Sequence, residues 1–89
     1  MTERNQTAHI TVTVAARRTD VEPRVVRHCV QLGLVSERLT EADLVELRRV
    51  RRLTNLGVNL AGVEIILRMR RQIEELQAEM ERLEAFGGR

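Results

Sequence analysis

The stretch that decides the fold is VNLAGVEIILRMRRQIEELQAEMERL, residues 58–83. It contains no proline, and no glycine occurs between Gly62 and Gly87, so an uninterrupted helix is expected. At about 1.5 Å per residue, a helix over residues 60–85 would be roughly 39 Å long. A helix of this length cannot bury its apolar side chains on the remainder of an 89-residue chain.

The apolar residues of this stretch recur at alternating intervals of three and four, the heptad pattern of a coiled coil. We call the six residues that follow this pattern the seam: Ile66, Met69, Ile73, Leu76, Met80 and Leu83. We expect the seam to form a dimer interface with a second copy of the chain. The alternative is a helix packed on its own domain, because the pattern covers fewer than three heptads.

The charges beside the seam predict how the two copies lie. The first half carries Arg68, Arg70 and Arg71, whereas the second half is acidic, with Glu74, Glu75, Glu79, Glu81 and Glu84. A parallel pair would place like charges together, and an antiparallel pair places opposite charges together. We therefore expect an antiparallel homodimer through residues 60–86. Each exposed ion pair contributes only about 0–1 kcal/mol, so the charges select the orientation and the apolar seam supplies the affinity.

The composition limits the possible classes of protein. Phe86 is the only aromatic residue, so an aliphatic core of packed helices is expected and an aromatic platform for single-stranded nucleic acid is not. Cys29 is the only cysteine, which excludes an internal disulfide and fits a cytosolic protein. The polar N-terminal segment does not resemble a secretory signal, and no apolar run approaches the ~20 residues that span a membrane. We therefore expect a cytoplasmic protein with no membrane partner.

The residues before the long helix predict two short helices joined by a turn. Residues 14–18 are expected to be helical, with Thr13 as the N-cap. Residues 20–23 form the turn, and Pro23 suits the first position of a second helix over residues 23–32, which Gly33 ends. Two short helices with such a turn are typical of a helix-turn-helix unit.

A third helix is expected after Thr40, because Thr40 and Asp43 have the spacing of an N-terminal cap. Its inward residues are Leu44, Leu47, Val50 and Leu53, and Asn59 can cap the long helix that follows. The predicted fold is therefore all-α. We divide it into a flexible N-terminus (1–9), a helix-turn-helix head (10–57), a coiled-coil dimerisation helix (58–86) and a flexible tail (87–89).

This order of segments resembles the MerR superfamily of small helix-turn-helix proteins. The resemblance covers roughly residues 10–86 and rests on three stretches: VAARRTDVEPRVVRHCVQLGLV, LTEADLVELRRVRRL and GVNLAGVEIIL. The last stretch looks like two branches associated with the DnaK–DnaJ chaperone system. One branch holds HspR-type heat-shock repressors, and the other holds chaperone modulators, the CbpM-like and DnaK–DnaJ assembly-factor proteins. The family implies a dimer through the C-terminal helix.

Two differences favour the modulator branch. The repressors carry a wing, a Gly/Arg-rich hairpin that ends in Arg-Tyr, whereas residues 34–40 here contain only Arg38 as a basic residue and neither Gly nor Tyr. Repressors also show Leu-Arg-x-Tyr-Asp/Glu in the recognition helix, and residues 26–30 keep only Arg27 of that pattern. Because half or more of protein–DNA hydrogen bonds go to phosphate and sugar, loss of the wing removes contacts that position the protein.

The resemblance thus implies a non-enzymatic modulator or assembly factor that binds a DnaJ-type co-chaperone and possibly DnaK. The alternative is a MerR/HspR-type DNA-binding transcriptional regulator of heat-shock genes, and a third reading is a dimerisation adaptor with no link to chaperones. For the co-chaperone, whose basic surface engages DnaK in the family picture, the candidate binding residues are Glu41, Asp43 and Glu46.

The candidate DNA-binding residues are basic and lie in the first two helices: Arg17, Arg18, Arg24, Arg27 and His28. The alternatives are a solvated basic face or a site for an acidic protein surface, as also holds for the arginines at 48–52. Without a wing we expect at most weak, salt-sensitive, sequence-independent binding to duplex DNA. No metal-ligand spacing, nucleophile–base set or Gly-rich phosphate loop is present, so we expect no metal, no cofactor and no catalysis.

Overall fold

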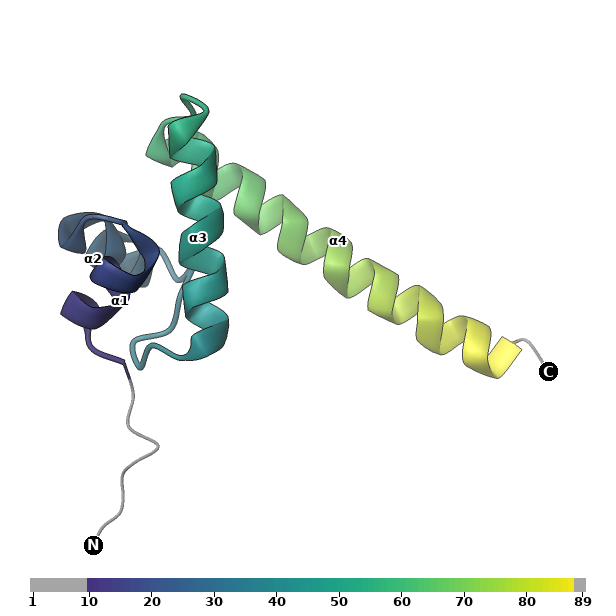
Figure 1. Cartoon of the computed structure of the whole chain (residues 1–89). Helices are drawn as coiled ribbons and strands as arrows, with labels where there is room; N and C mark the ends of the chain where they lie inside the picture. The colour runs from purple at the N-terminus through teal and green to yellow at the C-terminus, as the bar shows by residue number, and fades with distance from the viewer. Residues whose placement is uncertain (1–9, 88–89) are drawn as a thin grey trace, which may run out of the picture.

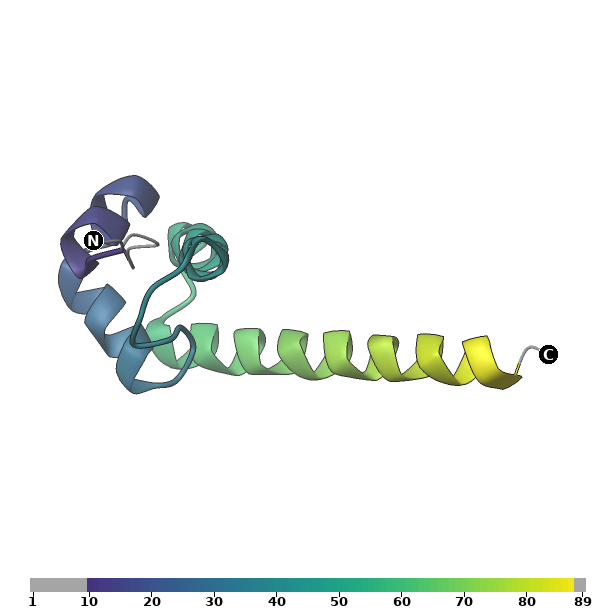
Figure 2. The same ribbon diagram turned by 90° about the horizontal axis from the view of Figure 1, so that it is seen from below.

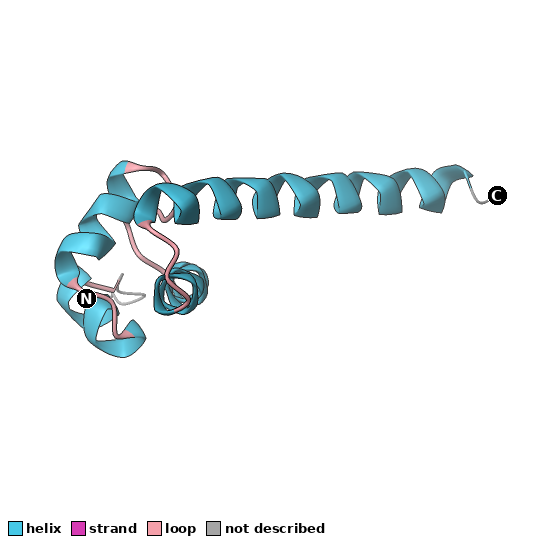
Figure 3. Ribbon diagram, turned by 90° about the horizontal axis from the view of Figure 1, so that it is seen from above, coloured by secondary structure: helices cyan, strands magenta, loops and turns pink. Residues whose placement is uncertain are grey.

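The computed structural model describes residues 10–87, which form the helices α1 (Val12–Thr19), α2 (Pro23–Gln31), α3 (Glu41–Asn55) and α4 (Leu60–Gly87) (Figure 1). Over this range the helices are connected by loops (Figure 3). The only β-type pairing among these residues is an isolated antiparallel bridge between Ile10 and Leu39. The all-α prediction is confirmed. The predicted flexible N-terminus, residues 1–9, and the last two residues of the predicted tail lie outside the described residues.

The first three helices form a head, and α4 leaves that head as a single rod (Figures 1 and 2). α1 packs against α2 and α3, and α4 packs against α3. In the view of Figure 2, α3 is seen along its axis beside the first turns of α4. The shape is accordingly flat and extended, with principal extents of 49 × 44 × 19 Å.

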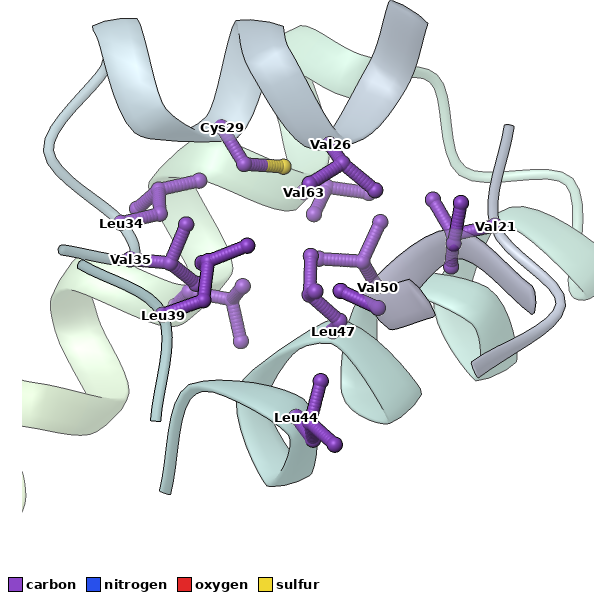
Figure 4. Close-up of a cluster of buried hydrophobic side chains, with 13 residues drawn as sticks. Val21, Val26, Cys29, Leu34, Val35, Leu39, Leu44, Leu47, Val50 and Val63 are labelled. Atoms are coloured by element: carbon purple, nitrogen blue, oxygen red, sulfur yellow. The ribbon is translucent and has the colours of Figure 1, made fainter. Parts of the chain in front are cut away.

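The core lies where the head meets the start of α4 (Figure 4). α2 contributes Val26 and Cys29, and α4 contributes Val63 and Leu67, all at most 1% exposed. The other fully buried large side chains come from α3 and from the α2–α3 connection: Leu39, Leu44, Leu47 and Val50. Among the described residues of α4, none after Leu67 is buried, so only the first two turns contribute side chains to the core.

α1 begins two residues earlier than the sequence predicts. Thr11, and not Thr13, has the extended backbone of an N-cap, and its hydroxyl accepts a hydrogen bond from the Val14 N–H at 3.1 Å. The bridge explains the difference, because the Ile10 N–H donates to the Leu39 carbonyl at 3.0 Å and keeps the chain extended up to Thr11. The prediction that Thr13 caps this helix is therefore wrong.

The other helix starts agree with the sequence. Pro23 is the first residue of α2, and Thr40 and Asp43 form a reciprocal capping box at the start of α3. At the start of α4, the Gly62 N–H donates to the Asn59 side-chain oxygen at 2.8 Å. Each of these residues acts within three positions of its own helix end, which is why local sequence identifies them.

α2 and α3 end in the same way, at two Leu-Gly corners formed by Leu32–Gly33 and Leu56–Gly57. Both glycines have positive φ, +77° at Gly33 and +92° at Gly57. In each corner the glycine N–H donates to the carbonyl three residues earlier, and the next N–H donates to the carbonyl five residues earlier, at 2.9–3.0 Å. This pattern is the Schellman motif, which satisfies carbonyls that the helix end leaves unpaired.

Candidate nucleic-acid interface

Three features hold the turn between α1 and α2 in its conformation. Asp20 adopts the left-handed conformation with φ 58°, and the Val21 side chain that follows it is buried. The Thr19 hydroxyl donates to the Ala15 carbonyl at 2.7 Å. Arg51 of α3 lies 2.9 Å from the Asp20 carboxylate, an ion pair that sequence reasoning did not find. α2 is therefore presented by the head in one orientation relative to α1.

The outer face of α2 is basic. Arg24, Arg27 and His28 are exposed there and, together with Gln31 and Leu60 of α4, line one surface hollow. The opposite face of α2 carries Val26 and Cys29 into the core (Figure 4). The structure thus brings three of the five predicted DNA-binding residues together, and the hollow adds Gln31, which the sequence did not single out.

Nearby carboxylates neutralise little of the positive charge of Arg24 and Arg27. Arg24 lies 3.4 Å from Glu22, but their side chains are 85% and 71% exposed, so this pair is weak. Within the part of the chain that the structure describes, no carboxylate forms an ion pair with Arg27 or with Arg17, an exposed residue of α1. Arg17 lines a separate hollow beside the turn. These side chains are available to an anionic partner.

Arg18 does not belong to this surface. Its guanidinium donates two hydrogen bonds to the Glu41 carboxylate, each 3.0 Å long, and so ties α1 to the start of α3. The bidentate pair lowers the pKa of Glu41, chiefly through the hydrogen bond, and raises the pKa of Arg18. Because the two residues are 23 positions apart, no local pattern in the sequence indicates their contact.

The three carboxylates predicted to bind a co-chaperone are engaged within the chain. Besides Glu41, Asp43 accepts hydrogen bonds from the Thr40 N–H at 3.0 Å and from the Ser36 hydroxyl at 2.6 Å. Partial burial raises the pKa of Asp43, but the bonds from Ser36 and Thr40 outweigh it, so the net pKa is lowered. Glu46 lies 2.9 Å from Arg49, with its side chain only 15% exposed. All three carboxylates thus have partners within the head, although the Glu41 side chain remains 71% exposed.

Cys29 is a core residue. Burial, reinforced by the charge of Glu46, raises the pKa of its thiol to about 11, so the neutral thiol persists at physiological pH. His28, its neighbour in sequence, points to the solvent instead. No cluster of three or more His, Cys, Asp or Glu residues that could hold a metal ion occurs between residues 10 and 87.

The six seam residues lie along one side of α4 and are 39–63% exposed. Ile66, Met69 and Ile73 line a shallow apolar hollow, with Arg70 and Glu74 beside it. A second groove runs between the end of α3 and the start of α4, where Leu53, Leu56 and Ile66 are flanked by arginines, namely Arg49, Arg52 and Arg70. The chain alone therefore leaves a continuous apolar strip uncovered.

Two of the three arginines assigned to the basic half of the seam face the head. Arg68 donates from Nη2 to the Leu32 carbonyl at 2.6 Å, and Arg71 donates to the Leu34 carbonyl at 3.2 Å. Arg70 instead lies beside the seam, 3.2 Å from Glu74. The charge argument for an antiparallel pair thus depends on fewer residues than the sequence suggests, because periodicity cannot show contacts across 36 and 37 residues.

Comparison with known proteins gives two findings. A sequence profile for MerR HTH family regulatory proteins matches residues 10–70. A Streptomyces coelicolor protein that carries the provisional name heat shock protein HspR is 35% identical over 83 residues, which cover 83% of this chain and 55% of that protein. The chain thus spans about half the length of that relative. No solved structure matches the chain significantly. None of the described helices is long and apolar enough to cross a membrane.

Proposed function

Because the chain belongs to the MerR family of helix-turn-helix regulatory proteins, we propose that it is a DNA-binding transcriptional regulator with α2 as its recognition helix. The observation that carries this proposal is the two-sided nature of α2. Its inner residues Val26 and Cys29 are completely buried, whereas Arg24, Arg27 and His28 face the solvent from a rigid head. The similarity to a protein named for heat shock further supports heat-shock genes as the targets.

The positions of the exposed residues suit a major groove. In helix-turn-helix proteins the second helix lies in that groove, and its N-terminal residues reach the base edges. Arg24 is the second residue of α2, and Arg27 follows one helical turn later. Arginine forks bind guanine edges and phosphates in a bidentate manner. We therefore assign base contact to Arg24 and Arg27, and phosphate contact to Arg17 on α1.

A second copy of the chain completes this function, because one head without a wing makes few phosphate contacts. We propose an antiparallel homodimer in which Ile66, Met69 and Ile73 pack against Leu83, Met80 and Leu76 of the other copy. This register pairs all six seam residues. It also places Ile65 near Phe86 of the other copy; these residues are 60% and 81% exposed in the single chain and flank opposite ends of the seam.

The α3–α4 groove supports the same orientation. Its rim carries Arg49, Arg52 and Arg70, and the antiparallel register brings the acidic end of the partner helix, with Glu79 and Glu84, to this rim. Oppositely charged surfaces favour one orientation over the other at modest gain in affinity. The apolar contacts of the seam remain the main source of dimer stability.

Selection of DNA sequences tests the proposal. The purified protein is mixed with a library of random 30-base-pair duplexes at 150 mM salt, and bound DNA is sequenced through successive rounds. We expect enrichment of an inverted repeat, and loss of that enrichment for Arg27→Ala. Arg82→Ala, on the distal part of α4, is the matched control and keeps the enrichment. Binding with no enriched sequence, lost on raising the salt concentration, would contradict a specific regulator.

A second candidate function is modulation of the DnaK–DnaJ system through a DnaJ-type co-chaperone, and possibly DnaK. The α2–α3 connection favours it, because residues 32–40 form a short loop whose Leu34, Val35 and Leu39 are buried and which holds no hairpin. The predicted partner site stays Glu41, Asp43 and Glu46. Calorimetry with a purified DnaJ-type protein tests this role directly; absence of measurable heat at 100 μM would remove it.

A charge reversal locates that partner site. Glu41→Lys with Glu46→Lys should weaken association with the co-chaperone and flatten its salt dependence. Since Glu41 also binds Arg18, the single variant Arg18→Gln is the control for loss of that ion pair alone. Unchanged affinity in the charge-reversed variant would move the site elsewhere on the surface.

A further inference from the structure

The C-cap of α2, Leu32, and the loop residue Leu34 have carbonyls with no backbone donor among the described residues. The N–H groups of Leu32, Gly33 and Leu34 all donate to carbonyls within α2. Arg68 and Arg71 of α4 donate to these two carbonyls, at 2.6 Å and 3.2 Å. The C-terminus of a helix carries partial negative charge, so the Arg68 guanidinium on the C-cap carbonyl stabilises it, and Arg71 holds the loop that follows.

The second Leu-Gly corner provides an internal comparison. The Leu56–Gly57 corner at the end of α3 has the same backbone hydrogen bonds and the same positive glycine φ. Within residues 10–87, no side chain donates to the carbonyls of Leu56 or Val58, and Leu56 is 79% exposed. The Schellman geometry therefore needs no arginine, and the two contacts at the end of α2 serve something other than the turn itself.

These contacts join elements that otherwise meet mainly through the core. α2 packs chiefly on α1, and α4 packs chiefly on α3. Arg71 continues the head-facing side of α4 after Val63 and Leu67, at the i+4 spacing that places residues on one helix face. Arg68 is further held by Glu64, whose carboxylate lies 3.0 Å away on the preceding turn.

We infer that Arg68 and Arg71 are positioning residues that lock the end of the recognition helix to the dimerisation helix. Without them, α2 would be held by α1 and the core but would lose its direct polar link to α4. In the dimer, the direction of α4 then fixes how α2 enters the groove. Only this consequence for DNA rests on the proposed function; the link between α2 and α4 does not.

The test compares two variants with the same loss of charge. The first is Arg68→Gln with Arg71→Gln. The matched control is Arg38→Gln with Arg82→Gln, which removes two exposed arginines that lie outside the seam and outside the α3–α4 groove; within residues 10–87, Arg82 pairs with Glu79 of its own helix and the Arg38 side chain forms no ion pair. Circular dichroism and light scattering of both variants check that helix content and oligomeric state match those of the parent.

Amide hydrogen exchange, measured without DNA, reports the link itself. In the first variant we expect the amides of Gly33 and Leu34 to exchange on the order of tenfold faster, as for loss of about one charged hydrogen bond. The amides of Gly57 and Val58, in the Leu56–Gly57 corner, should exchange at the rate of the parent in both variants. Equal exchange of Gly33 and Leu34 in the parent and the first variant would overturn the inference.

Affinity for the duplex recovered by the selection above reports the consequence for DNA. If the freed helix occupies its binding orientation about one-tenth of the time, Kd rises about tenfold beyond that of the charge-matched control. If the amides of Gly33 and Leu34 exchange faster in the first variant but its Kd for the duplex equals that of the control, the inference that the two arginines position α2 for DNA is overturned. If the selection recovers no duplex, the proposed function fails, whereas exchange at Gly33 and Leu34 still decides whether the two arginines hold α2.

Discussion

Replacement of Ile73 by Asp tests the antiparallel dimer at its centre. Ile73 is 52% exposed in the single chain and packs against Leu76 of the other copy in the proposed register. Full burial of such a side chain contributes about 1.5–3 kcal/mol, so covering its exposed half contributes about 1 kcal/mol per copy. A carboxylate transferred into an apolar seam adds at least about 2 kcal/mol for each copy.

The total loss for Ile73→Asp is therefore roughly 6 kcal/mol per dimer, which raises the dimer Kd about 10⁴-fold. Light scattering coupled to size exclusion measures the outcome, since the monomer has a mass of 10.2 kDa and the dimer twice that mass. The parent should be dimeric at 50 μM and the variant monomeric. Ala78→Asp adds the same carboxylate on the opposite side of α4 and should remain dimeric. A monomeric parent, or a dimeric Ile73→Asp variant, would refute the seam.

Three further predictions concern DNA binding, pH and backbone geometry. Arg17→Gln, which removes the assigned phosphate contact, should weaken duplex binding about equally for all sequences and reduce the salt slope by about 1, whereas Arg82→Gln should change neither; fluorescence anisotropy at several salt concentrations measures both, and equal slopes would contradict the assignment. Asp43 has a lowered pKa in the folded head, so its stabilisation is present above its ordinary value of 3.8 and is lost as the pH falls through the folded value. Urea unfolding of Asp43→Asn should therefore show about 1 kcal/mol less stability at pH 7 and a flatter decline below about pH 4; a parallel decline would exclude this role. Gly57→Ala should destabilise the fold by about 1 kcal/mol in thermal or urea unfolding, because φ is +92°, although no atom beyond the adjacent residues lies within 4 Å of the added methyl group; an unchanged stability would show that the corner relaxes.

The sequence predicts those parts of the fold that depend on neighbouring residues. Pro23, the Thr40–Asp43 cap and Asn59 each act within their own helix end, and the structure has the helix starts where these residues indicate. The start of α1 is the exception, because Leu39, far along the chain, holds Ile10 extended and moves the cap to Thr11. The local sequence pattern predicts Thr13, whereas the tertiary contact with Leu39 makes Thr11 the cap.

The candidate site shows the same limit more strongly. The outward placement of Arg24 and Arg27 follows from the apolar face that Val26 and Cys29 define, so sequence reasoning could find it. The pairing of Arg18 with Glu41 could not be found in this way, because charge alone does not show whether an arginine faces solvent or a distant carboxylate. Consequently, Arg18, which is predicted to contact DNA, and Glu41, which is predicted to contact the co-chaperone, bind each other.

The length of α4 sets the distance between the two heads in the proposed dimer. Leu67 is the last buried residue of this helix, and in the proposed register it lies alongside residue 82 of the other copy, which separates the two head attachments by roughly 22 Å along the pair. Removing one heptad from the exposed part of α4 would shorten that separation by about 10.5 Å, equal to about three base pairs of duplex. In the proposed dimer, the number of residues in α4 therefore sets the spacing of the two DNA half-sites that the heads can bind at the same time.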